Sequence, residues 1–130
     1  MNIEELTRGY FAALEQGATG EKLAAYYHAD VVQEEFPNQL APTGAQRNLN
    51  EILAAAERGQ QAISGHRYQI LNMIVDGNRA AVEFAWSGTL VVSVGKLSPG
   101  TIVRGRFASF LEFQDGRIIA QRSYDCFDPW

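Results

Sequence analysis

The fold is decided by residues 101–127, which read TIVRGRFASFLEF, then QDG, then RIIAQRSYDCF. In the first run, apolar and polar side chains alternate, as they do along a strand that buries one face. Between the two runs, Asp115-Gly116 is typical of a tight hairpin turn. The segment therefore predicts two long antiparallel strands, over residues 101–113 and 117–127.

Two further strand-like runs precede this hairpin, at residues 66–75 and 79–94. Asp76-Gly77-Asn78 separates them, and Ser98-Pro99-Gly100 breaks the next connection; both are turn sequences. The second half of the chain therefore predicts a four-stranded antiparallel meander, and strands of this length curl as they twist.

The first half of the chain shows helical spacing instead. Apolar residues at steps of three and four predict a helix over residues 2–16, and Thr19 is a suitable cap for a short second helix ending near residues 28–30. A brief strand over residues 31–36 follows. A third helix, over residues 48–61, opens with a capping-box pattern.

Helices precede strands rather than alternating with them, which is typical of the α+β class. We expect residues 1–130 to form a single domain, because a core of ordinary size needs most of that length. The expected architecture is a curled antiparallel sheet that forms a cone. The three N-terminal helices would close it and leave a cavity where helices and sheet do not quite meet.

Composition excludes several classes of protein. With 46% hydrophobic residues the chain can bury a core, and with a net charge of −4 it has no basic stripe for nucleic acid. Glu4, Glu5 and Glu15 are unlike a signal peptide, and no apolar run is long enough to span a membrane, so a cytoplasmic protein without a membrane partner is expected. Cys126 is the single cysteine and no Cys/His cluster has metal-ligand spacing, so we expect no disulfide, no metal and no cofactor.

Strand alternation also predicts which side chains line the inside of the cone. The predicted pocket wall contains one polar residue among apolar ones: Phe84, Trp86, Phe107, Ser109 and Leu111. Trp86 belongs to this wall rather than to the chemistry.

The opposite face of residues 101–113 carries Arg104 and Arg106 and must point outward, which places Phe110 outside as well. An exposed Phe110 suggests that a second copy of the chain covers this face, so a homodimer is expected. For residues 117–127, the face with Ser123 and Asp125 and the face with Arg122 are both mixed in polarity. Which of them lines the cavity stays open.

Three segments carry a resemblance to a known family: YFAALEQG at 10–17, YHADVV at 27–32 and FQDGRI at 113–118. With these markers the chain resembles the SnoaL-like and ketosteroid-isomerase-like members of the nuclear transport factor 2-like superfamily, which also contains limonene epoxide hydrolase. The resemblance implies a cone of curled sheet, three helices at its mouth and a homodimer through the outer sheet face. The fold alone does not give the activity.

The resemblance also implies candidate catalytic residues. Tyr10 matches the tyrosine that the isomerases carry on their first helix, and Glu35, preferred to Glu34 by the family register, lies close to their aspartate base. Ser109 stands where the isomerases have a neutral acid. This departure from the isomerase pattern argues against steroid isomerisation. Asp125, if it points inward, supplies a second carboxylate.

Tyr10 has a simpler interpretation from the residues alone, since a tyrosine on an apolar helix face is often a packed core residue. Arg47 lies in the loop ahead of the third predicted helix, where it could reach over the mouth of the cone, but it is best explained as a surface residue. A buried Glu35 without a cation beside it would have a raised pKa, as a base working near neutral pH requires.

Two functions follow from the sequence. In the first, a cofactor-free isomerase or cyclase acts on a small apolar organic ligand, with Glu35 as base, Tyr10 as donor to the oxyanion and Asp125 assisting. In the second, the same fold is a binding or interaction module without chemistry. Whether the protein is an enzyme stays open at this point.

Overall fold

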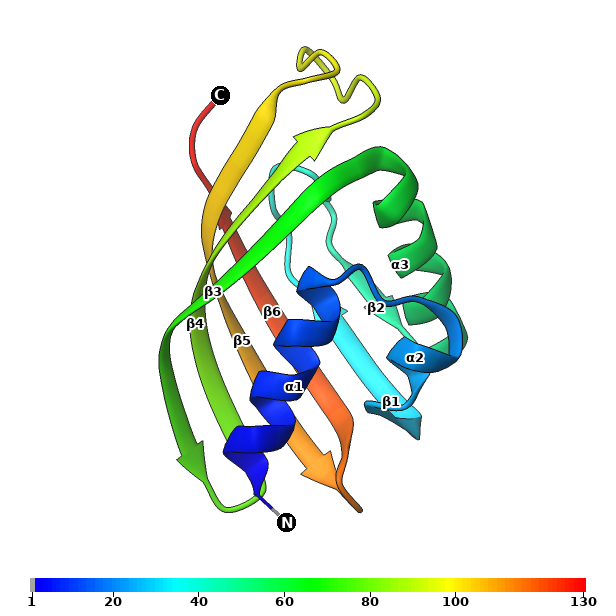
Figure 1. Cartoon of the computed structure of the whole chain (residues 1–130), viewed down its shortest axis with the longest axis vertical. Helices are drawn as coiled ribbons and strands as arrows, with labels where there is room; N and C mark the ends of the chain where they lie inside the picture. The colour runs from blue at the N-terminus through cyan, green and yellow to red at the C-terminus, as the bar shows by residue number, and fades with distance from the viewer. Residues whose placement is uncertain (1) are drawn as a thin grey trace.

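Within residues 2–130, which the computed structural model describes, the elements follow the order that the sequence predicts, except for the short strand β2 (Ala45–Arg47), which was not predicted (Figure 1). The helices are α1 (Ile3–Glu15), α2 (Gly20–Ala24) and α3 (Leu49–Ala62). The strands are β1 (Tyr27–Glu35), β2 (Ala45–Arg47), β3 (Ile63–Asp76), β4 (Arg79–Leu90), β5 (Ile102–Gln114) and β6 (Arg117–Phe127).

Side-chain caps mark the starts of the two longer helices. The Asn2 side chain accepts a hydrogen bond from the Glu5 backbone N–H at 3.0 Å at the start of α1. The capping box between Asn48 and Glu51 opens α3, with both reciprocal bonds formed. Thr19 precedes α2 without a side-chain cap bond. That helix is shorter than predicted, because the chain turns into β1 at Tyr27.

The described residues form one six-stranded sheet in the order β2-β1-β6-β5-β4-β3. Its four long strands are the predicted antiparallel meander, but β1 runs parallel to β6, and the short β2 pairs antiparallel with β1. The sheet is therefore mixed and unclosed, and the parallel pairing of β1 with β6 was not predicted. A pairing between distant segments leaves no mark on local periodicity, so the pattern of either strand gives no sign of it.

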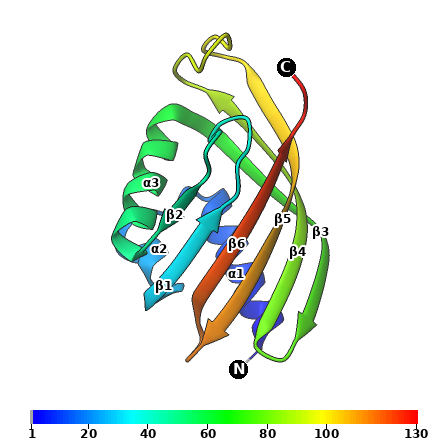
Figure 2. The ribbon, with the colours of Figure 1, turned by 180° about the vertical axis from the view of Figure 1, so that it is seen from behind.

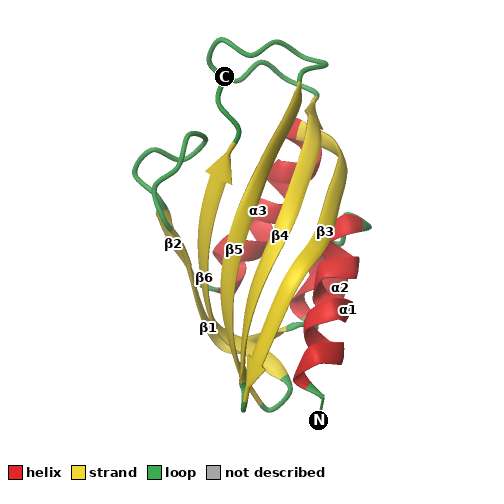
Figure 3. Ribbon diagram, turned by 90° about the vertical axis from the view of Figure 1, so that its left-hand side faces the viewer, coloured by secondary structure: helices red, strands yellow, loops and turns green. Residues whose placement is uncertain are grey.

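The α+β class and the curled, cone-like sheet are confirmed. All three helices lie on one side of the sheet (Figure 3), with α1 packed on β3 and β4 and α3 packed on β1. The opposite, convex face is seen from behind in Figure 2 and carries no helix. No helix in residues 2–130 has the length and apolar character needed to cross a membrane.

Burial confirms the predicted inner faces of β4 and β5. The buried side chains include all five of the predicted wall: Phe84, Trp86, Phe107, Ser109 and Leu111. Phe110 is on the outer face and 40% exposed, as its alternation predicts. On β6, Gln121 is buried while Tyr124 is exposed, so the inner face is the one that carries Gln121, Ser123 and Asp125. This decides the alternative that polarity left open.

Candidate functional site

A cavity of about 380 Å³ lies between the concave face of the sheet and the helices. That volume is within the usual range for small-molecule sites. Apolar side chains from α1, α3 and the central strands form much of its wall. Its polar and ionisable lining residues are Tyr10, Tyr27, Gln33, Glu35, Arg47, Gln60, His66, Tyr68, Ser109, Gln121, Ser123 and Asp125.

Not every predicted wall residue reaches the cavity. Phe84, Phe107 and Ser109 line it. Trp86 and Leu111 are outside the lining: the Trp86 ring stacks on Phe107 at 5.6 Å between centroids, and Leu111 is fully buried in the core. The predicted catalytic residues Tyr10, Glu35 and Asp125 share the cavity, while their chemical roles remain predictions.

A pair of tyrosine hydroxyls forms one wall of the cavity. The Tyr10 and Tyr27 hydroxyl oxygens are 2.6 Å apart, and the Gln121 side-chain N–H donates to Tyr10 at 3.0 Å. Burial raises the pKa of both tyrosines, so both hydroxyls keep their protons near neutral pH. Only one of the two O–H groups is used between them, which leaves the other to donate to Gln121 or to a bound molecule.

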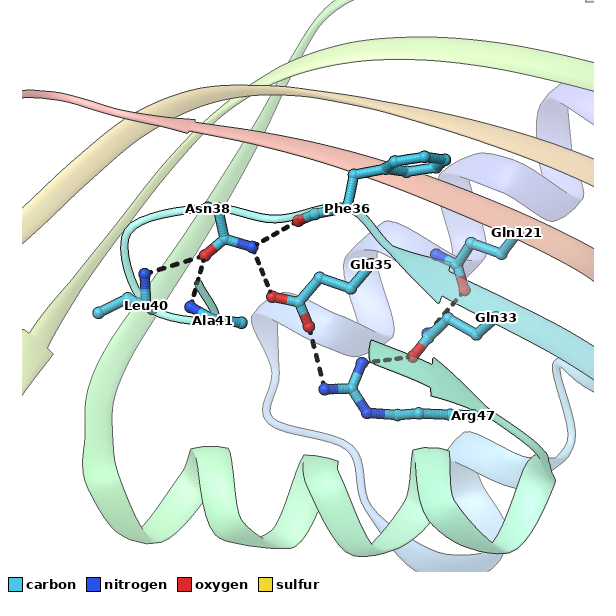
Figure 4. Close-up of polar contacts among 8 residues, drawn as sticks. All are labelled: Gln33, Glu35, Phe36, Asn38, Leu40, Ala41, Arg47 and Gln121. Atoms are coloured by element: carbon cyan, nitrogen blue, oxygen red, sulfur yellow. Dashed lines mark hydrogen bonds and ion pairs between the residues drawn. The ribbon is translucent and has the colours of Figure 1, made fainter. Parts of the chain in front are cut away.

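A chain of side-chain amides links this pair to an arginine. Arg47 Nη1 donates to Gln33 Oε1 at 3.1 Å, and Gln33 Nε2 donates to Gln121 Oε1 at 2.9 Å (Figure 4). Because a guanidinium can only donate, Arg47 fixes the orientation of the Gln33 amide, which in turn fixes that of Gln121. The Gln121 N–H groups are thereby directed toward Tyr10 and, at 3.4 Å, toward the Ser109 hydroxyl.

Glu35 is held from both sides (Figure 4). Arg47 Nη2 lies 3.0 Å from its Oε1, and Asn38 Nδ2 donates to its Oε2 at 2.8 Å. The Asn38 side-chain oxygen accepts from the backbone N–H groups of Leu40 and Ala41, which fixes the loop that carries it.

The prediction that Arg47 is a surface residue is wrong, because Arg47 lines the cavity. The premise that the Glu35 carboxylate has no cation beside it is wrong as well. Arg47 reaches the cavity because β2 pairs with β1, opposite Gln33.

Asp125 is the carboxyl that lacks such partners. Within residues 2–130 its carboxylate oxygens accept no hydrogen bond and form no ion pair within 4.0 Å. Burial raises the pKa of Asp125 to about 7, the negative charge of Glu35 adds to the rise, and Arg47 acts against it. Asp125 is therefore poised to gain or lose a proton near neutral pH.

Sequence analysis missed most of the polar residues that organise the cavity. Tyr27, Gln33 and Gln121 come from β1 and β6, whose parallel pairing brings them together. An amide in the middle of a strand has no distinctive spacing, so the sequence held no signal for the two glutamines. No group of three or more His, Cys, Asp or Glu residues in the described part of the chain is arranged to hold a metal ion.

The chain belongs to the SnoaL-like domain family, whose profile matches residues 7–121. Among solved structures it is similar to AclR, a proposed hydroxylase from Streptomyces galilaeus, with a TM-score of 0.80, 16% identity and coverage of 98% of this chain and 80% of that one. IdmH, a proposed polyketide cyclase from Streptomyces antibioticus, gives a TM-score of 0.80 at 18% identity, over 96% of this chain and 92% of its own.

A SnoaL-like polyketide cyclase from Agrobacterium tumefaciens gives a TM-score of 0.75 at 16% identity, over 96% of this chain and 91% of its own. Identities this low establish that the fold is shared. They do not establish that the activity is shared. No curated protein matches the sequence.

Proposed function

We propose that the protein binds a small, largely apolar organic molecule in the cavity and acts on it by cofactor-free proton transfer, as an isomerase or a cyclase does. The observation that carries this proposal is the Asp125 carboxyl, which lies in the cavity without a bonded cation or hydrogen-bond donor. Membership of the SnoaL-like family supports a small organic ligand. Of the similar structures, one is described as a polyketide cyclase and another as a proposed polyketide cyclase.

The proposed roles differ from the sequence hypothesis at one point. Asp125, rather than Glu35, takes and returns the proton, because Glu35 is already bonded to Arg47 and Asn38. Burial and, after it, the negative charge of Glu35 raise the pKa of Asp125, which makes the ionised Asp125 a stronger base. The Tyr10–Tyr27 pair donates its remaining O–H to the oxygen on which charge develops. If Tyr10 provides that O–H, hydrogen bonds from Gln121 and Tyr27 strengthen it as a donor.

A binding module without chemistry is the second candidate. It is favoured by the bonds that Glu35, Tyr10 and Gln121 already form with one another or with their neighbours, which leave few free polar groups for a reaction. The free Asp125 carboxyl favours the enzyme. The two candidates differ in one observable property, which is exchange of a proton on a bound ligand.

The test uses 1-tetralone, a fused-ring ketone with acidic hydrogens next to its carbonyl, in D₂O. A base takes one of these protons, the electron pair moves onto the ketone oxygen as an enolate, and return of a deuteron completes the exchange. NMR should detect exchange that wild type catalyses. Asp125→Asn should slow it by about a hundredfold or more, while Asp128→Asn, which removes an exposed acid nearby, should not.

Glu35→Gln provides a second measurement. Removing its charge should lower the pKa of Asp125, so the rising limb of the pH–rate profile should move to lower pH while catalysis persists. Equal exchange rates in wild type and Asp125→Asn would refute the role of Asp125. Binding of 1-tetralone without any catalysed exchange would favour the binding module.

A further inference from the structure

A third tyrosine, Tyr68, lines the cavity, and the proposed chemistry does not use it. The Tyr10 and Tyr27 hydroxyls are bonded to each other. The only hydrogen bond that Tyr68 makes outside the sheet is donated by its backbone N–H, and its hydroxyl bonds to no residue in the range 2–130. Tyr68 therefore brings an unused O–H group to the cavity wall.

The Tyr68 hydroxyl is also accessible. Among the buried and half-buried residues of the described chain, only His66 has a side-chain nitrogen or oxygen that is both unbonded and shut off from contact. The unbonded Tyr68 oxygen is consequently open to the space around it. The nearby Trp86 indole donates its hydrogen bond to His66 at 3.3 Å. An indole N–H can only donate, so Trp86 cannot accept the Tyr68 proton.

Packing fixes the Tyr68 ring on the cavity side of the sheet. Tyr68 pairs with Trp86, whose side chain is buried on the concave face, so both side chains share that face. The Tyr68 ring contacts Phe84 and Phe11, which line the cavity, with centroids 5.8 Å and 6.1 Å away. Its backbone N–H donates to Glu15 at 2.9 Å, which ties the edge strand β3 to α1. The hydroxyl is thus held in place before a ligand arrives, which lowers the entropic cost of using it.

The Tyr68 hydroxyl keeps its proton across the neutral range. Burial raises its pKa, and Tyr10 and the charge of Asp125 add to the rise, while the Trp86 indole acts against it. Tyr68 is therefore a permanent donor near neutral pH, whereas the Asp125 carboxyl loses its proton at about pH 7.

The sheet register places Tyr68 beyond Asp125 as seen from the paired tyrosines. Gln121, which bonds to Tyr10, precedes Asp125 along β6. The row of paired residues that leads across β5 and β4 to Tyr68 begins after Asp125, at Phe127. Asp125 therefore lies at a level of the sheet between the two sets of tyrosine donors.

We propose that Tyr68 is a specificity-determining residue whose hydroxyl donates a hydrogen bond to an oxygen of the bound molecule, on the side of Asp125 away from the Tyr10–Tyr27 pair. The preferred ligand is then an apolar ring system with two separated oxygen functions, one at the reacting end and one at Tyr68. This inference rests on the proposed function for the reacting end only. Donation by Tyr68 is a property of binding and requires no turnover.

Probes of matched shape separate this hydrogen bond from simple packing. They are 6-acetyl- and 7-acetyl-1-tetralone, which have a second carbonyl oxygen, and the corresponding isopropyl compounds, which lack it. Calorimetry gives the ratio of dissociation constants within each pair. Tyr68→Phe keeps the ring and removes the hydroxyl, so the acetyl preference of at least one pair should fall about tenfold while its isopropyl member binds as before. Tyr124→Phe, the same change on the convex face, should leave the ratios unchanged.

Two further readouts respond to the hydrogen bond and not to packing. Carbon-13 NMR of the labelled acetyl carbonyl should show a downfield shift on binding to wild type and a smaller shift with Tyr68→Phe. The acetyl preference should also stay constant from about pH 5 to about pH 9, because Tyr68 remains protonated throughout. A preference that disappears as the pH rises through about 7 would assign the donor to protonated Asp125 instead and overturn the proposal.

Equal weakening of both members of a pair in Tyr68→Phe, or no acetyl preference in wild type for either pair, would also overturn it. A preference that depends on Tyr68 in a protein that exchanges no ketone protons would support this inference and count against the proposed enzyme. Catalysed exchange with no such preference would do the reverse.

Discussion

Asp125 has a pKa set by its neighbours, since it lies beside apolar walls and near the charge of Glu35. The environment that suits Asp125 to proton transfer also destabilises the folded protein when the Asp125 carboxyl is ionised. The folded protein binds the Asp125 proton more tightly than the unfolded chain does, with a pKa of about 7 against an ordinary value of 3.8. The stability of the protein should therefore depend on pH through this one residue.

Asp125→Asn should be more stable than wild type at about pH 8, by up to about 4 kcal/mol, and nearly equal to it at about pH 4. The protonated Asp125 carboxyl stabilises the folded state of wild type. This contribution is fully present below the pKa that Asp125 has in the unfolded chain, and it is lost as the pH rises through about 7. Urea unfolding of both proteins across this range measures the difference, and Asp128→Asn is the control. A constant difference between wild type and Asp125→Asn at all pH values would contradict the assignment.

Strand alternation in the sequence could not predict that Asp125 points inward, for a specific physical reason. Next to the turn, Phe113 pairs with Ile118, but Glu112 pairs with Ala120, so one extra residue is inserted into β6. Such a bulge reverses the face of every later side chain. Without it, Arg122 and Tyr124 would line the cavity. In contrast, β4 and β5 pair without interruption, and their inner faces were predicted correctly.

At the scale of elements, the site depends on the loop between β1 and β2, which sequence analysis did not connect to the cavity. The strand β2 is three residues long, too short to give a periodic pattern, yet it carries Arg47. Gly44 directly precedes β2 with a φ of 68°. A Cβ atom there would lie 2.5 Å from the Glu35 backbone oxygen.

Gly44→Ala should lower the free energy of unfolding by more than Gly20→Ala does. Both glycines have positive φ, so both substitutions should cost about 1 kcal/mol or more in backbone strain. Only at Gly44 would the added methyl also collide with backbone, since nothing lies within 4 Å of a Cβ at Gly20. Chemical denaturation measures both, and equal losses would mean that the loop yields without disturbing Glu35.

At the scale of the whole molecule, the convex face of the sheet has an aromatic cluster on β5 and β6. Phe110 and Tyr124 are 40% and 42% exposed, and their ring centroids are 5.8 Å apart. Phe36, from the loop after β1, stacks on Tyr124 at 4.5 Å. An apolar cluster on an uncovered sheet face favours association with a second copy of the chain.

Light scattering should give the mass of a homodimer for wild type and that of a monomer for Phe110→Glu. Val92→Glu, which places the same charge at an exposed apolar site in the loop after β4, should remain dimeric. A monomeric wild type would exclude the dimer, whereas a dimeric Phe110→Glu would place the contact on another surface.

The parallel pairing of β1 with β6 also constrains how the chain can fold during synthesis. Strand β6 lies between β1 and β5, so it joins β1 and β2 to the rest of the antiparallel meander, which is formed by β3, β4 and β5. Until residues 117–127 have left the ribosome, β1 and β5 each present an unpaired edge, and Gln33 has no Gln121 to orient. Unpaired edges of this kind promote aggregation. Nascent chains of this protein should therefore depend on chaperones until residues 117–127 are available for pairing, and the cavity should form only after β6 has been inserted between β1 and β5.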